Sequence, residues 1–154
     1  MKRDLIFEAV YPHPPEHVWR ALTDSQAMAE WLMPNDFKPQ VGNRFQFRTK
    51  PAPGFDGIVR CEVLELEPPR KLVYTWKGGP VDTVVTFTLT PVPEGTRLRL
   101  EQRGFCGLNA WLVSFLLGGG WKKIVNRHLP SVLARLTDQG LLPRGKEDPE
   151  QCRP

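Results

Sequence analysis

Hydrophobic and polar residues alternate with a two-residue period over much of the chain. Leu5, Phe7 and Ala9 share one side of a pleat over residues 3–11, which indicates a first strand. After residue 41 the same period returns in five segments joined by short stretches rich in turn-forming residues. Such short connections join antiparallel strands, because parallel strands need long crossovers. The pattern predicts a six-stranded antiparallel sheet from residues 3–11, 44–49, 57–67, 70–77, 82–90 and 96–105.

One valine departs from this alternation. In residues 82–90, Val85, Phe87 and Leu89 make an apolar face, and threonines make the opposite, polar face. Val84 would fall on the threonine face. We therefore expect a β-bulge at Val84 and Val85.

Two short helices are expected directly after the first strand. Pro15 suits the first turn of a helix, because its missing N–H would be unpaired there anyway. Residues 18–22 give this helix an apolar stripe. Asp24 or Ser25 can then cap a second helix that runs to Trp31.

Residues 121–136 carry the clearest helical period in the chain. Their apolar residues recur at every third or fourth position, and His128 lies on the apolar face of this pattern. Pro130 lies inside the helix and removes one backbone hydrogen bond. We expect the helix to bend or break near residues 126–128.

Glycines and polar residues mark the expected boundaries of the domain. Residues 109–117 are apolar and permit a helix, but three glycines at 118–120 follow them and predict a flexible joint. The last residues are polar and contain prolines, so they offer little apolar surface to bury. We expect one domain over residues 1–138 and a mobile tail over residues 139–154.

Cysteine usage and apolar run lengths bear on the cellular compartment. The three cysteines, at positions 61, 106 and 152, are too scattered for a disulfide framework and lack the close pairs of a zinc site. The N-terminal residues hold only a short apolar run, and residues 108–120 are too short to cross about 30 Å of hydrocarbon. We expect a cytoplasmic protein with no membrane insertion, no metal site and no cofactor.

The net charge of +4 and the pI of about 9.1 permit weak attraction to anionic partners without identifying one. Arg97, Arg99 and Arg103 share one face of a predicted strand with Glu101. A platform for nucleic acid would also need aromatic residues on that face, and the alternate apolar residues point the other way. The stripe is therefore interpreted as a solvated face, and no nucleic-acid partner is expected.

Several segments of the chain resemble one protein family. They are residues 14–24 (PPEHVWRALTD), Trp31, residues 65–76 (ELEPPRKLVYTW), residues 95–98, residues 104–105 and residues 120–121. They are similar to the activator of heat-shock-protein-90 ATPase homologue-like branch of the SRPBCC superfamily, which includes START domains and pollen allergens. The resemblance implies an α+β helix-grip fold, in which a curved six-stranded antiparallel sheet wraps around a long C-terminal helix. Two residues depart from the family pattern: Gln102 replaces a frequent histidine, and Pro130 interrupts a helix that is usually continuous.

Aromatic residues are numerous for a chain of this size. They either fill the space between sheet and helix or surround a ligand there, and the sequence leaves both interpretations open. Tyr74, Gln102 and His128 are the best candidates for polar groups in such a pocket. The candidate ligand-binding residues are Trp31, Phe37, Phe45, Phe47, Phe55, Tyr74, Trp76, Phe87, Leu100, Gln102, Phe105, Trp111, Phe115, Trp121, Val125 and His128.

The preferred functional hypothesis is that a small hydrophobic molecule, either a lipid or an aromatic or polyketide-like compound, binds between sheet and helix. No catalysis is expected, and the glycine joint at 118–120 and the loop at 51–56 would gate entry. One alternative is a cyclase or hydrolase that uses His128 with Tyr74 or Gln102. The other alternative, which only the family resemblance implies, is a chaperone-associated protein with a role in the stress response.

Overall fold

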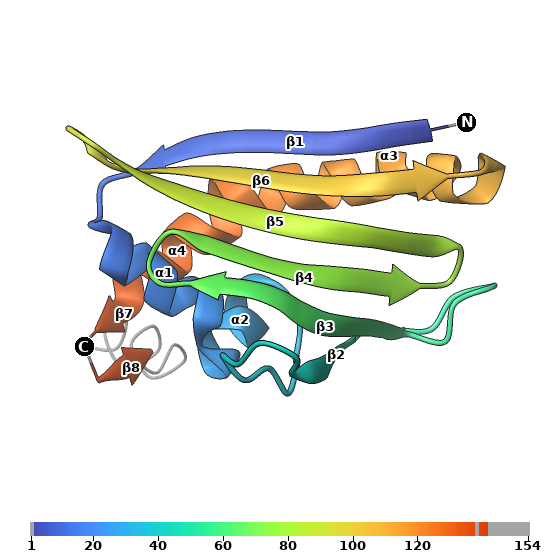
Figure 1. Cartoon of the computed structure of the whole chain (residues 1–154), viewed down its shortest axis with the longest axis horizontal. Helices are drawn as coiled ribbons and strands as arrows, with labels where there is room; N and C mark the ends of the chain where they lie inside the picture. Colours follow the sequence, from blue (N-terminus) through green and yellow to red (C-terminus); the bar gives the residue numbers. More distant parts are fainter. Residues whose placement is uncertain (1, 138, 142–154) are drawn as a thin grey trace, which may run out of the picture.

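The six predicted strands form a single antiparallel sheet. The computed structural model describes residues 2–137 and 139–141. The strand order across the sheet is β1-β6-β5-β4-β3-β2, so neighbours in the sequence are neighbours in the sheet except where β1 returns to pair with β6 (Figure 1). The strands are β1 (Lys2–Tyr11), β2 (Arg44–Arg48), β3 (Ile58–Glu67), β4 (Lys71–Gly78), β5 (Val81–Val92) and β6 (Gly95–Cys106).

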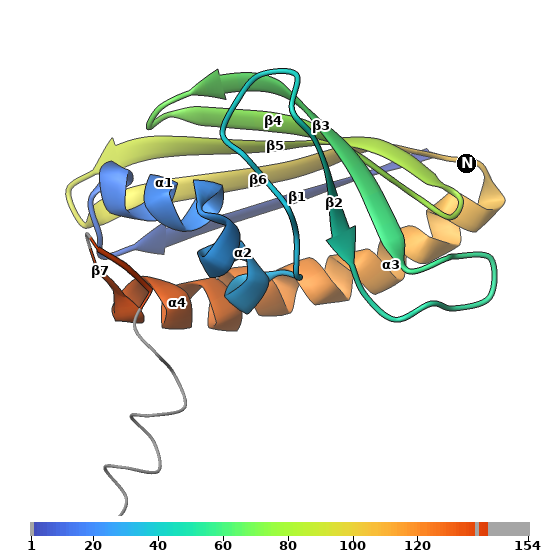
Figure 2. The same ribbon diagram turned by 90° about the horizontal axis from the view of Figure 1, so that it is seen from below.

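The helices cover one face of this sheet, which gives the expected α+β helix-grip fold (Figure 2). Two short helices follow β1, as predicted, and a long helical segment follows β6. They are α1 (Pro15–Thr23), α2 (Ser25–Trp31), α3 (Leu108–Lys123), the π-helix η1 (Ile124–His128) and α4 (Leu129–Arg135). Figure 2 shows α1 and α2 beside α4 at one end of the sheet, while α3 extends to the other end.

A small hairpin follows the last helix. The strands β7 (Leu136–Thr137) and β8 (Gly140–Leu141) pair in antiparallel fashion. Residues 142–154, most of the segment predicted as a tail, lie outside the described residues.

The prediction of a flexible joint at residues 118–120 is wrong. The long helix begins at Leu108, and α3 runs through all three glycines without interruption. A Cβ on Gly118 would lie 3.5 Å from the Leu5 Cδ2 atom, so this glycine faces β1 at close range. Packing of α3 on the sheet therefore outweighs the low helix propensity of glycine.

Where a bend or break was expected near residues 126–128, the helical segment continues through the π-helical turn η1. The N–H of Leu129 bonds to the carbonyl of Ile124, five residues earlier, in place of the usual four. The wider turn places Trp121, Val125 and Leu129 on the buried face at intervals of four residues. His128 is consequently exposed, which corrects its expected position on the apolar face.

The expected bulge at Val84 is also wrong. Strand β5 pairs with both β4 and β6 in unbroken register, and Val84 lies exposed on the outer face. The sheet shifts register at two other places, between Arg3 and Asp4 and between Val63 and Glu65. A single exposed valine on a polar face requires no local distortion.

A candidate ligand cavity

Most of the predicted pocket residues fill the space between sheet and helices. Phe45 contacts Phe37, Phe47 and Tyr74 at ring-centroid distances of 5.0–5.4 Å. Phe87 extends these contacts to Tyr74, Trp31 and Trp121. The predicted residues in this buried core are Trp31, Phe37, Phe45, Phe47, Tyr74, Phe87, Leu100, Gln102, Phe105, Trp121 and Val125.

An open cavity of about 780 Å³ lies beside this core, at the end of the molecule opposite α1. Figure 2 shows the loop between β2 and β3 and the first turns of α3 at this same end of the molecule. The wall comes from the first half of α3, this loop, the ends of the central strands and the segment after α2. Its residues are Met33, Thr49, Ala52, Pro53, Gly54, Phe55, Val59, Trp76, Gly78, Pro80, Val81, Asn109, Leu112, Val113, Leu116 and Leu117.

Only Phe55 and Trp76 of the predicted pocket residues belong to this wall. Trp111 and Phe115 lie on α3 but outside the wall, where their rings meet edge to face at 4.9 Å. His128 is exposed and belongs neither to the wall nor to the core. The structure thus divides the predicted residues among core, cavity and surface.

The sequence interpretation missed the α3 residues of the wall. Leu112, Val113, Leu116 and Leu117 recur at positions i, i+1, i+4 and i+5, a helical period that identifies one side of a helix. The joint expected at residues 118–120 separates this segment from the helix that begins at Trp121. The helical period of residues 112–117 was therefore not connected with that of the long helix. Residues 52–54 carry no comparable signal, because their position depends on how the loop folds.

Glycines in the β2–β3 loop and in the facing β4–β5 turn allow the loop to pack at the cavity wall. Ala52 and Phe55 exchange two backbone hydrogen bonds of 2.9 Å around a turn in which Gly54 has a φ of +77°. A Cβ on Gly78 would lie 3.1 Å from the Phe55 ring, and one on Gly79 would lie 3.1 Å from the Gly54 carbonyl. The absence of side chains at Gly78 and Gly79 therefore lets Phe55 pack directly on the β4–β5 turn.

Trp76 lines the cavity and carries an indole N–H group. Among the described residues, the indole N–H of Trp76 makes no hydrogen bond. It is not among the fully buried side-chain atoms that lack a partner, since the Tyr74 hydroxyl is the atom of that kind in the described part of the chain. The Trp76 nitrogen must therefore reach open space. Since this side chain is buried and lines the cavity, we infer that the space it reaches is the cavity.

Two predicted polar groups of the pocket, Gln102 and Tyr74, lie in the core instead. The Gln102 amide accepts a 2.7 Å bond from the Trp121 indole and donates a 2.9 Å bond to the Thr83 hydroxyl. That hydroxyl donates in turn to the carbonyl of Trp76 at 3.1 Å. The Tyr74 hydroxyl has no partner among the described residues, and burial, with a smaller contribution from Cys61, raises its pKa well above the usual value.

The catalytic arrangement considered from the sequence is not assembled. Its histidine, His128, is exposed, whereas Tyr74 and Gln102 are fully buried and no hydrogen bond joins them to it. Burial also raises the pKa of the Cys61 thiol, which disfavours the reactive thiolate. No cluster of metal-ligating side chains occurs among the residues that the structure describes.

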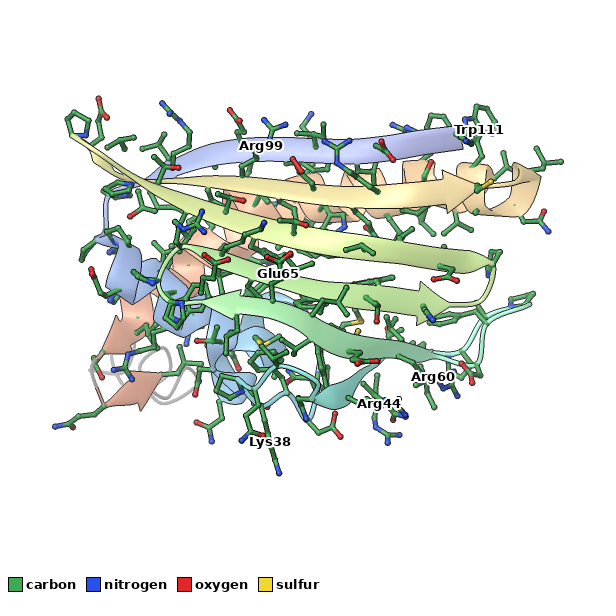
Figure 3. The ribbon with its side chains drawn as sticks, viewed as in Figure 1. Lys38, Arg44, Arg60, Glu65, Arg99 and Trp111 are labelled. Atoms are coloured by element: carbon green, nitrogen blue, oxygen red, sulfur yellow. The ribbon has the colours of Figure 1, made fainter. Side chains whose placement is uncertain are left out.

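Several charged residues of the outer sheet face pair with one another. Arg99 bonds to Glu8 and Glu101, and Arg103 bonds to Asp4 and Glu101. Hydrogen bonds from Arg103 and Arg99 lower the pKa of Glu101. Arg99 and Arg103 of the predicted stripe are thus already paired with acidic residues. Figure 3 shows Arg99 on this outer face.

No helix within residues 2–137 and 139–141 combines the length and hydropathy needed to cross a membrane.

Known structures share the fold over most of the chain. The crystal structure of protein MLL2253 from Mesorhizobium loti is 40% identical, with a TM-score of 0.79 over 88% of this chain and 99% of that chain. Protein BH1534 from Bacillus halodurans is 27% identical, with a TM-score of 0.72 and coverage of 86% and 99%. CalU16 from Micromonospora echinospora is 26% identical, with a TM-score of 0.65 and coverage of 84% and 73%. No curated protein matches the chain.

The sequence also matches a family over residues 12–134, from the end of β1 to the last turn of α4. The family is described as Activator of Hsp90 ATPase homolog 1-like protein. The match spans most of the sheet and the whole of α3, including the α3 part of the cavity wall. The chain belongs to the Activator of Hsp90 ATPase homolog 1-like family.

Proposed function

We propose that this protein binds a small hydrophobic molecule in the cavity between α3, the β2–β3 loop and the β4–β5 turn. The observation that carries the proposal is a cavity of about 780 Å³ with a mainly apolar wall. Ligand pockets in proteins range from about 300 to 1,000 Å³ and have predominantly apolar walls with a few polar groups. The volume and the wall both fit that description.

The wall also indicates the chemistry of the ligand. Leucine, valine, proline and aromatic side chains favour an extended apolar body, such as an acyl chain or fused aromatic rings. The Trp76 indole would donate a hydrogen bond to one oxygen of the ligand. Thr49 and Asn109 add the remaining polar side chains. A lipid or an aromatic or polyketide-like compound with one carbonyl or hydroxyl would satisfy these groups.

Binding without catalysis is the form of the proposal that the wall favours. None of its residues carries a side chain that titrates in the usual pH range, so it offers no general acid, general base or activated nucleophile. A ligand would contact apolar groups and neutral polar groups only. We therefore propose a role in carrying, sequestering or sensing its ligand.

The sequence prediction of a chaperone partner is a separate proposal. It comes from the family description alone, and a pull-down with the middle domain of the chaperone would test it. Recovery of nothing would remove it. A cytoplasmic location is likewise a proposal, based on the scattered cysteines.

Two tryptophan variants on α3 test the cavity. Leu112 and Leu108 are one helical turn apart and about equally exposed, but only Leu112 lines the cavity. Leu112→Trp should narrow the cavity and weaken binding at least tenfold, whereas Leu108→Trp should leave affinity within about twofold. Isothermal titration calorimetry with lauric acid, naringenin and emodin would measure both variants against the unchanged protein.

Thermal unfolding gives an independent reading of the same interaction. A ligand at about one hundred times its dissociation constant stabilises the native state by about 2.7 kcal/mol. For a domain of this size, that corresponds to a rise in Tm of roughly 5–10 °C. Binding in this cavity would be contradicted if none of the three compounds gave a heat of binding or a change in Tm. It would also be contradicted if Leu112→Trp and Leu108→Trp lowered the affinity equally.

A further inference from the structure

The long helical segment has an unusual charge distribution. From Leu108 to Arg135 it contains no aspartate or glutamate. Lys122, Lys123 and Arg127 are exposed along it. Its solvent side therefore carries positive charge without acidic residues of its own to balance it.

The first half of α3 exposes large apolar side chains on the same side. Leu108, Leu112, Phe115 and Leu116 are 55%, 53%, 50% and 77% exposed, at positions i, i+4, i+7 and i+8. This spacing gathers them on one helix face, which we call the α3 face. Apolar residues scattered singly need no explanation, whereas a contiguous exposed group marks an interaction site.

We propose that the α3 face docks on the surface of an anionic phospholipid bilayer. Helices that lie in a membrane interface combine bulky apolar residues with lysine and arginine. The apolar residues of the α3 face would enter the outer acyl region, and Lys122 and Lys123, next along the helix, would meet acidic headgroups. Each lysine or arginine near an anionic membrane surface raises the membrane partition coefficient about fivefold. The docking is peripheral and requires no spanning segment.

The elements beside the α3 face support this charge complementarity. The Arg3 guanidinium on β1 lies 3.8 Å from the Phe115 ring centroid and donates a 3.2 Å hydrogen bond to Ser114, so another cation borders the apolar group. Two acids in the neighbouring segments are paired: Asp4 bonds to Arg103, and Asp56 bonds to Arg60. These pairs limit the repulsion that an anionic surface would meet.

Charge also favours a bilayer over a second copy of this chain as the occupant. Two copies joined through their α3 faces would bring together two helices that contain lysine and arginine but no acidic residue. An anionic bilayer neutralises the same lysines. The partner that fits both the apolar and the basic half of the helix is therefore acidic lipid.

Docking would bring the proposed ligand site to the membrane. Leu112 and Leu116 belong to both the α3 face and the cavity wall, so a docked molecule would hold the cavity beside the acyl chains. A hydrophobic ligand could then exchange with the bilayer over a short path. This last step rests on the proposed function, whereas docking itself does not require an occupied cavity.

Co-sedimentation of the full chain with vesicles tests the docking. Binding should be strong to vesicles of phosphatidylcholine mixed with phosphatidylserine, weak to phosphatidylcholine alone, and reduced by salt. The double change Lys122→Glu with Lys123→Glu should lower the partition coefficient about tenfold or more. Leu108→Gln with Phe115→Gln should lower it by a similar factor, and neither residue lines the cavity.

Two matched controls separate this face from general charge and hydrophobicity. Lys38→Glu with Arg44→Glu changes the net charge equally on the edge strand β2 and the segment before it, far from Trp111 of α3 (Figure 3). Ile6→Gln with Val10→Gln removes exposed apolar residues from β1. Both controls should bind vesicles within about twofold of the unchanged protein, and circular dichroism should confirm that every variant folds.

Three outcomes would overturn the proposal. The first is equal binding of the protein to neutral and anionic vesicles. The second is a loss of vesicle binding in the control variants as large as that in the α3 variants. The third is self-association without vesicles that disappears in the Leu108 and Phe115 variant, which would assign the α3 face to a second copy. Calorimetry in vesicle-free solution measures ligand binding separately, so failure of docking and failure of ligand binding remain distinguishable.

Discussion

Trp121 and Gln102 join the long helix to the sheet through a buried hydrogen bond. The indole N–H of Trp121 on α3 lies 2.7 Å from the Gln102 side-chain oxygen on β6, and both side chains are almost fully buried. The Gln102 amide also donates to Thr83 on β5. One side chain thus connects two strands and the helix, and a polar residue is retained in the core because all of these groups are paired.

Replacing Gln102 should therefore cost stability. Gln102→Leu leaves the buried Trp121 N–H without an acceptor, and such a loss costs about 1–3 kcal/mol. Gln46→Leu is the matched control, because the Gln46 side chain bonds only to an exposed arginine, and its change should stay within about 0.5 kcal/mol. Urea unfolding followed by tryptophan fluorescence measures both. Equal effects of the two changes would contradict the role assigned to Gln102.

The two tyrosines should respond in opposite directions to loss of their hydroxyl groups. The Tyr74 hydroxyl is buried without a partner among the described residues, so Tyr74→Phe should raise the free energy of unfolding by about 1 kcal/mol. The Tyr11 hydroxyl donates a 2.6 Å bond to the carbonyl of Val125, so Tyr11→Phe should lower it by about 1 kcal/mol. Changes of the same sign in urea unfolding would refute this contrast.

The continuous helix predicts that glycines in α3 can be replaced with a gain in stability. A Cβ on Gly119 or Gly120 meets no other atom within 4 Å. Alanine is favoured over glycine in a helix interior by about 0.5–1 kcal/mol. Gly119→Ala and Gly120→Ala should each stabilise the protein by about this amount in thermal unfolding.

A left-handed glycine elsewhere provides the control for these two changes. Gly95 has a φ of +142°, and a Cβ there would approach the backbone of Tyr11 too closely. Gly95→Ala should therefore destabilise the protein. If Gly119→Ala and Gly120→Ala also lowered Tm, the triplet would not behave as part of a regular helix.

The sheet could be predicted because one face of every long strand is buried. That burial imposes a two-residue period, as in Val85, Phe87 and Leu89, and the period can be seen without knowledge of tertiary contacts. The helix from Trp121 onward shows its own period for the same reason. His128 was misplaced because it lies in the π-helical turn η1, after which Leu129 returns to the buried face.

The cavity could not be predicted in the same way. Phe45 and Phe55 have the same side chain, yet Phe45 fills the core and Phe55 borders open space. Which of these occurs depends on how far α3 and the β2–β3 loop stand from the sheet. Sequence periodicity reports which face of an element is apolar, but it does not report the distance between two apolar faces.

The paired histidines near α1 predict a pH dependence of stability. The rings of His13 and His17 stack with centroids 4.7 Å apart, and the Nε2 atom of His17 lies 2.8 Å from the carbonyl of Leu133 on α4. Partial burial, and next the proximity of His17, lower the pKa of His13. The native state therefore disfavours protonation of His13 relative to the unfolded chain.

The sign of the effect follows from proton linkage. The unfolded state, in which the histidine pKa is about 6.5, binds more protons than the native state over the range between the two pKa values. The free energy of unfolding should thus fall as the pH decreases from about 6.5 through the lower native pKa of His13. His13→Gln should flatten this slope in urea unfolding, whereas His128→Gln, on an exposed position away from the stack, should retain it. Identical slopes in the two variants would show that the stacked pair does not control the response to pH.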